Sequence, residues 1–241
     1  MVGSEGRIEA VTLDAAGTLF MVAEPVGTTY ARIALRHGIQ RASSDLEARF
    51  RAAFRAAPPL ACPAGDRAEL DAYERAWWRR VVRRTLDASD APGFDACFAE
   101  LFAYFAEPRA WRVYPDVRAA LVTIRAAGIR TAVVSNFDRR LAAIIDGLGL
   151  AELFDLIVPS SAAGSAKPAP AIFRHALGGL GVPAERAVHA GDDPTDDVGG
   201  ARAAGLRAVL VDRTTERRPP PDVTVVRTLH ELLPILNASS D

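Results

Sequence analysis

The side chains of this 241-residue chain that could do chemistry follow short apolar runs, as polar residues follow buried strands. Asp14 comes after AVTL, Ser135 and Asn136 come after TAVV, Lys167 lies in the loop after LIVP, and Asp192 comes after AVHAG. Carboxylates can hold a hard cation or attack an electrophile, and an ammonium group can neutralise an anion. One aspartate in such a place is often only a turn or helix cap, but four polar strand ends in succession are a far more specific signal.

The elements that must position these side chains alternate between strand and helix. Short apolar runs predict strands at Ala10–Leu13, Arg130–Ser135, Leu156–Pro159, Ala187–Ala190, Ala208–Val211 and Val223–Val226. Amphipathic stretches predict helices at Asp116–Ala127, Arg139–Leu148, Pro170–Leu180, Asp196–Ala204 and Thr228–Leu233. Such alternation predicts an α/β fold, a parallel sheet with helices on both faces. Ligands of open parallel sheets bind at the carboxyl ends of the strands, so we expect the four polar stretches to meet there.

The segment from about residue 23 to 107 breaks this alternation because it contains no convincing strand. Its pattern predicts four helices, near Thr28–Arg36, Ser44–Ala56, Ala68–Asp87 and Phe94–Ala106. A helical block of this size, placed between the first strand and the rest of the α/β pattern, is best explained as an inserted all-helical cap domain. The expected division is therefore a core of residues 1–22 and 108–241 and a cap of residues 23–107.

The overall composition argues against several classes of function. The net charge is −1 and no apolar run reaches the ~18 residues that a membrane span needs, so we expect neither nucleic acid nor a membrane as a partner. The N-terminal sequence MVGSEGRIEA has no apolar signal core. The two cysteines, Cys62 and Cys97, lack the spacing of a metal site. We therefore expect a soluble, reduced, cytoplasmic protein that is a monomer or a homodimer.

The four polar stretches together resemble the motifs of the haloacid dehalogenase superfamily of aspartate-nucleophile hydrolases. DAAGT, which begins at Asp14, is similar to the first motif, Asp-x-Asp-x-Thr, except at the second aspartate. VVSN is similar to the second motif, AKPAPAIF to the third and AGDDPTDDVGGARAAG to the fourth. YERAWWRRVV and WRVYPDV further resemble the branch of the rhythmically-expressed-gene-two-like proteins. The resemblance covers essentially the whole chain and implies a Rossmann-like core with a mobile helical cap that closes over the site.

The resemblance also implies a role for each matching residue. Asp14 would be the nucleophile, and Ser135 and Lys167 would act with it in catalysis. The Mg²⁺ ligands would be three carboxylates and one backbone carbonyl, those of Asp14, Asp192, Asp197 and Ala16. The groups that bind phosphate would come from Thr18, Ser135, Asn136 and Lys167. Lys167 is the only lysine in a chain that otherwise uses arginine, which favours a specific function for it.

The fourth stretch contains more acids than a metal site needs. Thr195 is expected to be the N-cap of the following helix, with Asp196 a first-turn acid that the helix dipole favours. Asp193 stands where the family often has serine, so its role stays open. His189, on the strand before this stretch, is expected to be a core residue rather than a base.

Ala16 stands where phosphatases of this family usually carry the aspartate that protonates the leaving group and then activates water. General acid–base catalysis typically contributes roughly 10²–10⁴-fold, so we expect impaired proton transfer. The function expected is that of a Mg²⁺-dependent phosphatase acting on a small phosphorylated metabolite. Two alternatives stay open: a 2-haloacid dehalogenase-like hydrolase, whose halide leaves without a proton, and a catalytically impaired phospho-ligand-binding or regulatory protein. Phosphonoacetaldehyde hydrolase chemistry is excluded, because it needs a cap lysine that this sequence lacks.

Overall fold

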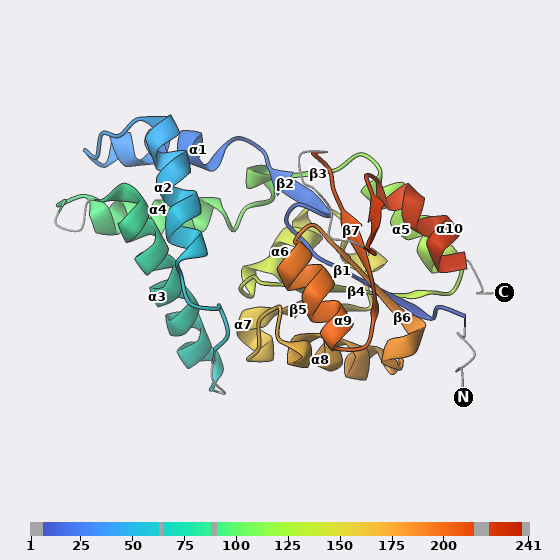
Figure 1. The fold of residues 1–241 in the computed structure, drawn as a ribbon. Coiled ribbons are helices and arrows are strands. Elements are labelled where there is room, and N and C mark those ends of the chain that lie inside the picture. The colour runs from blue at the N-terminus through green and yellow to red at the C-terminus, as the bar shows by residue number, and fades with distance from the viewer. Residues whose placement is uncertain (1–6, 63–64, 88–90, 215–221, 238–241) are drawn as a thin grey trace.

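A six-stranded parallel sheet forms the centre of the structure, a computed structural model that describes residues 7–62, 65–87, 91–214 and 222–237 (Figure 1). Its strands are β1 (Ala10–Leu13), β4 (Arg130–Ser135), β5 (Leu156–Pro159), β6 (Ala187–Gly191), β7 (Arg207–Val211) and β8 (Thr224–Val226). The strand order is β5-β4-β1-β6-β7-β8, and every neighbouring pair is parallel. β1 therefore lies between β4 and β6, so the residues that follow these three strands meet at one edge of the sheet.

Helices cover both faces of this sheet, as the alternating pattern predicts. They are α5 (Val117–Ala126), α6 (Arg140–Gly147), α7 (Ser160–Ala163), α8 (Pro170–Leu180), α9 (Gly200–Ala203) and α10 (Leu232–Asn237). In β1, Val11 and Leu13 belong to the hydrophobic cluster shared with α5, α6 and α10, whereas Ala10 belongs to the cluster shared with α8 and α9. Both faces of the central strand are thus buried, which explains its nearly continuous apolar sequence. The predicted α/β fold is confirmed.

A block of four helices is inserted between the first strand and the rest of the sheet. Its helices are α1 (Val26–Arg36), α2 (Ser43–Arg55), α3 (Arg67–Leu86) and α4 (Phe94–Tyr104), close to the predicted positions. α3 begins at a capping box in which Asp66 and Glu69 each accept a hydrogen bond from the other's backbone N–H at 2.9 Å. Within the described ranges, no helix is both long and apolar enough to span a bilayer.

Two short strands that the sequence analysis missed join the helical block to the core. β2 (Phe20–Val22) leads into the block and β3 (Trp111–Val113) leads out of it, and the two pair antiparallel. The rings of Phe20 and Trp111 also pack edge to face, with 5.2 Å between their centroids. Three-residue strands are too short to show a pattern in the sequence. Because the two crossings are paired, they form a single ribbon rather than two independent linkers.

Candidate active site

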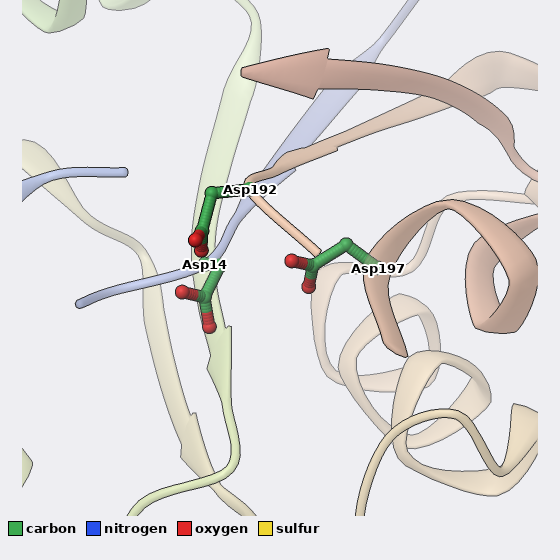
Figure 2. A group of neighbouring side chains, drawn as sticks. All are labelled: Asp14, Asp192 and Asp197. Carbon is green, nitrogen blue, oxygen red and sulfur yellow. The ribbon is translucent and has the colours of Figure 1, made fainter. Parts of the chain in front are cut away.

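Three aspartate carboxylates converge at the carboxyl edge of the sheet (Figure 2). Asp14 directly follows β1, Asp192 directly follows β6, and Asp197 comes from a π-helical turn at Pro194–Gly199. One carboxylate oxygen from each residue lies within 4.8 Å of the other two. Carboxylate oxygens are the ligands that Mg²⁺ prefers, and three of them so close together can surround a single cation.

Two glycines allow these carboxylates to approach the backbone. A Cβ atom on Gly17, whose φ is +97°, would lie 2.7 Å from the carboxylate carbon of Asp192. A Cβ atom on Gly191 would lie 2.2 Å from the carboxylate carbon of Asp197. Real Cβ atoms do not tolerate such distances, so a larger residue at either position would displace a carboxylate. The two glycines are therefore part of how the site is built.

Lys167 connects two of the three carboxylates. Its Nζ lies 2.5 Å from Oδ1 of Asp14 and 2.5 Å from Oδ1 of Asp197, and its side chain is only 3% exposed. Burial lowers the pKa of Lys167, but the charges of the two aspartates outweigh burial and hold this pKa above its ordinary value. Lys167 is thus a fixed positive charge, which excludes the solvated loop position that a lone lysine often occupies.

Asn136 holds the backbone of Lys167 in place. Its Oδ1 accepts a hydrogen bond from the Lys167 N–H at 2.7 Å, and its Nδ2 donates to the Lys167 carbonyl at 3.0 Å. Nδ2 also lies 3.1 Å from Oδ2 of Asp196. The resemblance to the haloacid dehalogenase superfamily implies that Asn136 binds phosphate. The structure gives its side chain a separate role, which is to fix the loop that carries the lysine.

The Asp197 carboxylate is held by several partners within the protein. Besides Lys167, it contacts His189 Nε2 at 3.0 Å and accepts from the backbone N–H of Asp193 at 2.9 Å. Burial raises the pKa of Asp197, but Lys167 and His189 overcome this and hold the pKa well below its ordinary value. His189 is fully buried, and its Nδ1 lies 2.8 Å from the Thr12 hydroxyl. It is a core residue, as predicted, and orients Asp197.

The predicted N-cap at Thr195 is wrong, because Asp193 performs this role. The Asp193 carboxylate accepts hydrogen bonds from the backbone N–H groups of Thr195 and Asp196, at 2.8 and 2.9 Å. Asp193 can reach both donors because the turn begins at Pro194, directly after Asp193 and two residues before the predicted helix start at Asp196. Asp196 also has more contacts than a first-turn acid needs, since it lines the site and accepts from Asn136.

Of the remaining predicted residues, Ser135 and Ala16 line the site and Thr18 does not. Ser135, the last residue of β4, is 3% exposed and lines the site together with Ala16, which is exposed toward it. Thr18 is fully buried outside the lining of the site, and its hydroxyl has no hydrogen-bond partner among the described residues. The Thr18 carbonyl instead accepts a hydrogen bond from Arg213 Nη2 at 2.6 Å. The structure therefore does not bring the Thr18 side chain into the site.

A cavity of about 360 Å³ lies between these residues and the helical block. Its floor contains the aspartates and Lys167, and its opposite wall is formed by apolar and aromatic side chains of α1–α4. Arg140, which the sequence analysis missed, also reaches this cavity from the start of α6. Its guanidinium pairs with the buried carboxylate of Asp138 at 2.7 Å and lies 3.9 Å from the ring centroid of Phe102.

The floor of the cavity carries an excess of negative charge. The described residues that line the cavity include five aspartates but only two cations, Lys167 and Arg140, and Arg140 is already paired with Asp138. The aspartates that line this floor are Asp14, Asp192, Asp193, Asp196 and Asp197. Burial raises the pKa of Asp14, and burial together with the charge of Asp193 raises the pKa of Asp196. An anionic ligand would be repelled from such a floor unless a cation were added to it.

Comparison with known proteins agrees with this architecture. The human haloacid dehalogenase-like hydrolase domain-containing protein 3 is 36% identical over 239 residues, which cover 96% of this chain and 94% of the relative. A phosphoserine phosphatase from Thermus thermophilus is 39% identical over 162 residues, 65% of this chain and 64% of the relative.

Two solved structures are also similar to this chain over almost its whole length. A HAD phosphatase from Thermococcus onnurineus is 25% identical, with a TM-score of 0.68 over 95% of this chain and 98% of the other. A 2-haloacid dehalogenase from Pseudomonas syringae shares the fold at 24% identity, with a TM-score of 0.66 over 95% of this chain and 97% of the other. The sequence pattern of one family, described as haloacid dehalogenase-like hydrolase, matches residues 8–205. The chain therefore belongs to the haloacid dehalogenase-like hydrolases.

Proposed function

We propose that this hydrolase is a Mg²⁺-dependent phosphatase that uses Asp14 as its nucleophile on a small phosphorylated metabolite. The observation that carries the proposal is the convergence of Asp14, Asp192 and Asp197 within 4.8 Å beside Lys167. A metal-free dehalogenase has no need for such a group of acids, whereas a phosphatase must neutralise both its own carboxylate and an anionic substrate. The relatives that are phosphatases by name support the same reading.

The residues present fit a magnesium ion. Three carboxylate oxygens and the exposed residue Ala16 lie on one side of the cavity, which leaves the other side open for water and a substrate oxygen. Gly17 and Gly191 leave the space that two of these carboxylates need. When bound, the ion would neutralise negative charge on the phosphoryl group and on the carboxylates. We propose Asp14, Asp192, Asp197 and the Ala16 carbonyl as its ligands.

In the first step, an oxygen of Asp14 attacks phosphorus, and the bond from phosphorus to the leaving oxygen breaks. Lys167 contacts Asp14, opposes the effect of burial on the Asp14 pKa and supplies positive charge to the transferring group. Ser135 lines the cavity at the end of the neighbouring strand, where its hydroxyl can donate to a phosphate oxygen. The product of this step is an aspartyl phosphate on Asp14.

In the second step, water attacks phosphorus, releases inorganic phosphate and regenerates the Asp14 carboxylate. Ala16 has no side-chain acid or base to offer in either step. The proton that an alkoxide leaving group requires must therefore come from elsewhere, or the leaving group must need none. We infer that this enzyme is efficient only with leaving groups that are stable as anions.

We also propose that the helical block, residues 23–107, acts as the cap of this site and that substrates enter when it moves away. The block already contributes one wall of the cavity above Asp14.

We further propose that the protein works in the reducing environment of the cytoplasm. Cys62 and Cys97 are both buried free thiols, which supports this location.

The test is a screen of phosphate esters, acyl phosphates and 2-haloacids with Mg²⁺ and with EDTA. We expect Mg²⁺-dependent release of phosphate that is abolished by Asp14→Asn and reduced by Asp192→Asn. Asp45→Asn is the matched control, because Asp45 forms an exposed ion pair with Arg49 on α2 and lies outside the lining of the cavity. Turnover of 2-haloacids in EDTA would establish the dehalogenase alternative. Mg²⁺-dependent binding of phosphate esters without turnover would establish the phospho-ligand-binding alternative.

A further inference from the structure

The wall of the cavity that faces the carboxylates is aromatic. The rings come from all four helices of the block: Tyr30, Phe50, Phe54, Trp78, Phe98 and Phe102. None of the described residues that α1–α4 place in this wall carries a charge. A ligand whose phosphoryl group lies on the carboxylate floor must therefore place the rest of its body against aromatic rings.

The polar groups of Trp78 and Arg140, which both line the cavity, already have protein partners. The indole N–H of Trp78 donates to Asp138 at 2.5 Å. Arg140 donates to the same carboxylate and to the Phe102 carbonyl, the latter at 2.7 Å. Among the described residues that line the cavity, each cation already has a carboxylate partner, so a carboxylate or a second phosphate on the leaving group would be buried unpaired, which is costly. The several hydroxyls of a sugar would likewise lack hydrogen-bond partners.

Tyr30 provides the exception. Its side chain is 2% exposed and lines the cavity, and no described residue forms a hydrogen bond with its hydroxyl. Burial raises the pKa of Tyr30, so the hydroxyl stays a neutral donor. A tyrosine hydroxyl among apolar side chains usually has a hydrogen-bond partner, and an acceptor atom on a ligand bound in the cavity would supply one here.

We propose that the substrate is an aryl phosphate, whose uncharged aromatic leaving group packs between the rings of the helical block while Tyr30 donates to a polar substituent on it. This inference rests on the proposed phosphatase function and adds the class of the leaving group. The cavity is large enough for it. A cavity of ~150 Å³ holds benzene, so about 360 Å³ accommodates a ring of one or two cycles together with a phosphoryl group.

The chemistry of Ala16 agrees with this substrate class. An Asp14 oxygen bonds to phosphorus, and the electrons of the phosphorus–oxygen bond leave on the aryl oxygen as a phenolate. A phenol has a pKa of about 10, whereas an alcohol is close to water at ~15.7, so a phenolate can leave unprotonated where an alkoxide cannot. Water then attacks phosphorus, its two protons remain on the departing dihydrogen phosphate, and Asp14 is regenerated as a carboxylate.

The experiment must separate binding of the ring from reactivity of the leaving group. Calorimetry with Mg²⁺ present compares phenylphosphonate with methylphosphonate, neither of which has a leaving group. We expect phenylphosphonate to bind about tenfold more tightly or better, because the ring buries apolar surface. In turnover, we expect kcat/KM for phenyl phosphate to exceed that for O-phosphoserine and glycerol phosphate.

Two variants of exposed apolar residues in the block provide the structural control. Phe54 lines the cavity and is 42% exposed, whereas Leu35 is 61% exposed and lies outside the lining. Phe54→Ala should reduce the preference for phenylphosphonate several-fold, and Leu35→Ala should leave it unchanged. Equal affinity of the two phosphonates, or higher kcat/KM for O-phosphoserine than for phenyl phosphate, overturns the inference. Failure of the proposed function would look different: no phosphate ester would be hydrolysed, while the phosphonate pair would still decide whether the wall binds a ring.

Discussion

Glu74 of α3 reaches out of the helical block and accepts hydrogen bonds from the backbone N–H and the Nε of Arg139 in the core, at 3.0 and 3.3 Å. The Ser161 hydroxyl donates to the same carboxylate oxygen at 2.5 Å. The Glu74 side chain is 6% exposed, so these contacts are shielded from water. They join the block to the core beside the cavity, and they must break if the block is to open.

The contacts of Glu74 lead to a prediction about how readily the helical block moves away from the core. Glu74→Gln removes the buried charge that three donors share, and hydrogen bonds to charged groups are worth about 1.5–3 kcal/mol each. We expect the open state of the ligand-free protein to become more populated, with a larger radius of gyration in solution scattering. A phosphate mimic such as a metal fluoride should restore the compact form.

The control for Glu74 uses the same arginine. Asp71 also pairs with Arg139, but its side chain is 64% exposed, and exposed pairs contribute only about 0–1 kcal/mol. Asp71→Asn should therefore leave the scattering curve unchanged. If Glu74→Gln scatters like the wild type with and without the mimic, this contact does not hold the block closed.

A second prediction concerns the space that Gly17 leaves for Asp192. Gly17→Ala places a Cβ atom where the Asp192 carboxylate now lies, at a residue whose φ of +97° already disfavours alanine. We expect a loss of Mg²⁺ affinity of at least tenfold, measured by calorimetry. Gly38→Ala separates the two effects, because Gly38 has a φ of +75° and nothing within 4 Å of the added atom. It should lower the melting temperature and leave Mg²⁺ affinity unchanged. Equal Mg²⁺ affinity of both variants and the wild type would mean that Asp192 is not a ligand.

The elements of this protein that follow a hydrophobic pattern could be predicted from the sequence. The strands and most helices follow from hydrophobic periodicity, and the carboxylates meet because parallel strands end at one edge of the sheet. The features that were missed depend on long-range contacts. β2 and β3 pair only because the chain returns to its own entry point, and Arg140 reaches the cavity only because Asp138 and Phe102 hold it there.

The cavity wall could not have been predicted either. Trp78 packs against the hydrophobic clusters of the helical block and also lines the cavity, as does Tyr30. Helical periodicity shows which face of a helix is apolar. It does not show whether that face packs against another helix or borders a ligand.

A third prediction concerns pH and the loop behind Asp14. The Asp116 carboxylate accepts hydrogen bonds from Arg213 at 2.7 Å and from the Leu229 N–H at 2.6 Å, and Arg213 in turn donates to Thr18. Burial raises the pKa of Asp116, but these donors outweigh burial and hold the pKa below its ordinary value of 3.8. A lowered folded-state pKa means that the stabilisation is complete well above pH 3.8 and is lost as the pH falls through the folded-state value.

Asp116→Asn should therefore lower the free energy of unfolding in urea by about 1.5–3 kcal/mol at pH 7. The difference from the wild type should shrink below pH 3.8, where the unfolded-state carboxyl is protonated. Asp95→Asn is the control, because Asp95 is 77% exposed and its pair with Arg79 should contribute little. If the difference in unfolding free energy between wild type and Asp116→Asn stays constant between pH 7 and the acid range, the negative charge of Asp116 is not the source of the stabilisation.

The last prediction concerns Ala16. If Asp14 attacks but no group activates water, an activated aryl phosphate should lose its leaving group quickly, while the aspartyl phosphate should be hydrolysed slowly. Rapid-quench kinetics should then show a burst of phenol followed by slow turnover.

The variant Ala16→Asp tests the same idea from the other side. It should speed hydrolysis of the aspartyl phosphate and raise steady-state hydrolysis of alkyl phosphates, by up to roughly 10²–10⁴-fold if the new carboxylate takes on both proton transfers. Ala16 is exposed and lines the cavity, so the new carboxylate would face the reacting groups. Ala16→Asn has the same size without the acid and should show neither gain. Absence of a burst in the wild type, combined with no gain in Ala16→Asp, would mean that another residue already transfers the proton, with Asp193 the first to test because it lines the same floor.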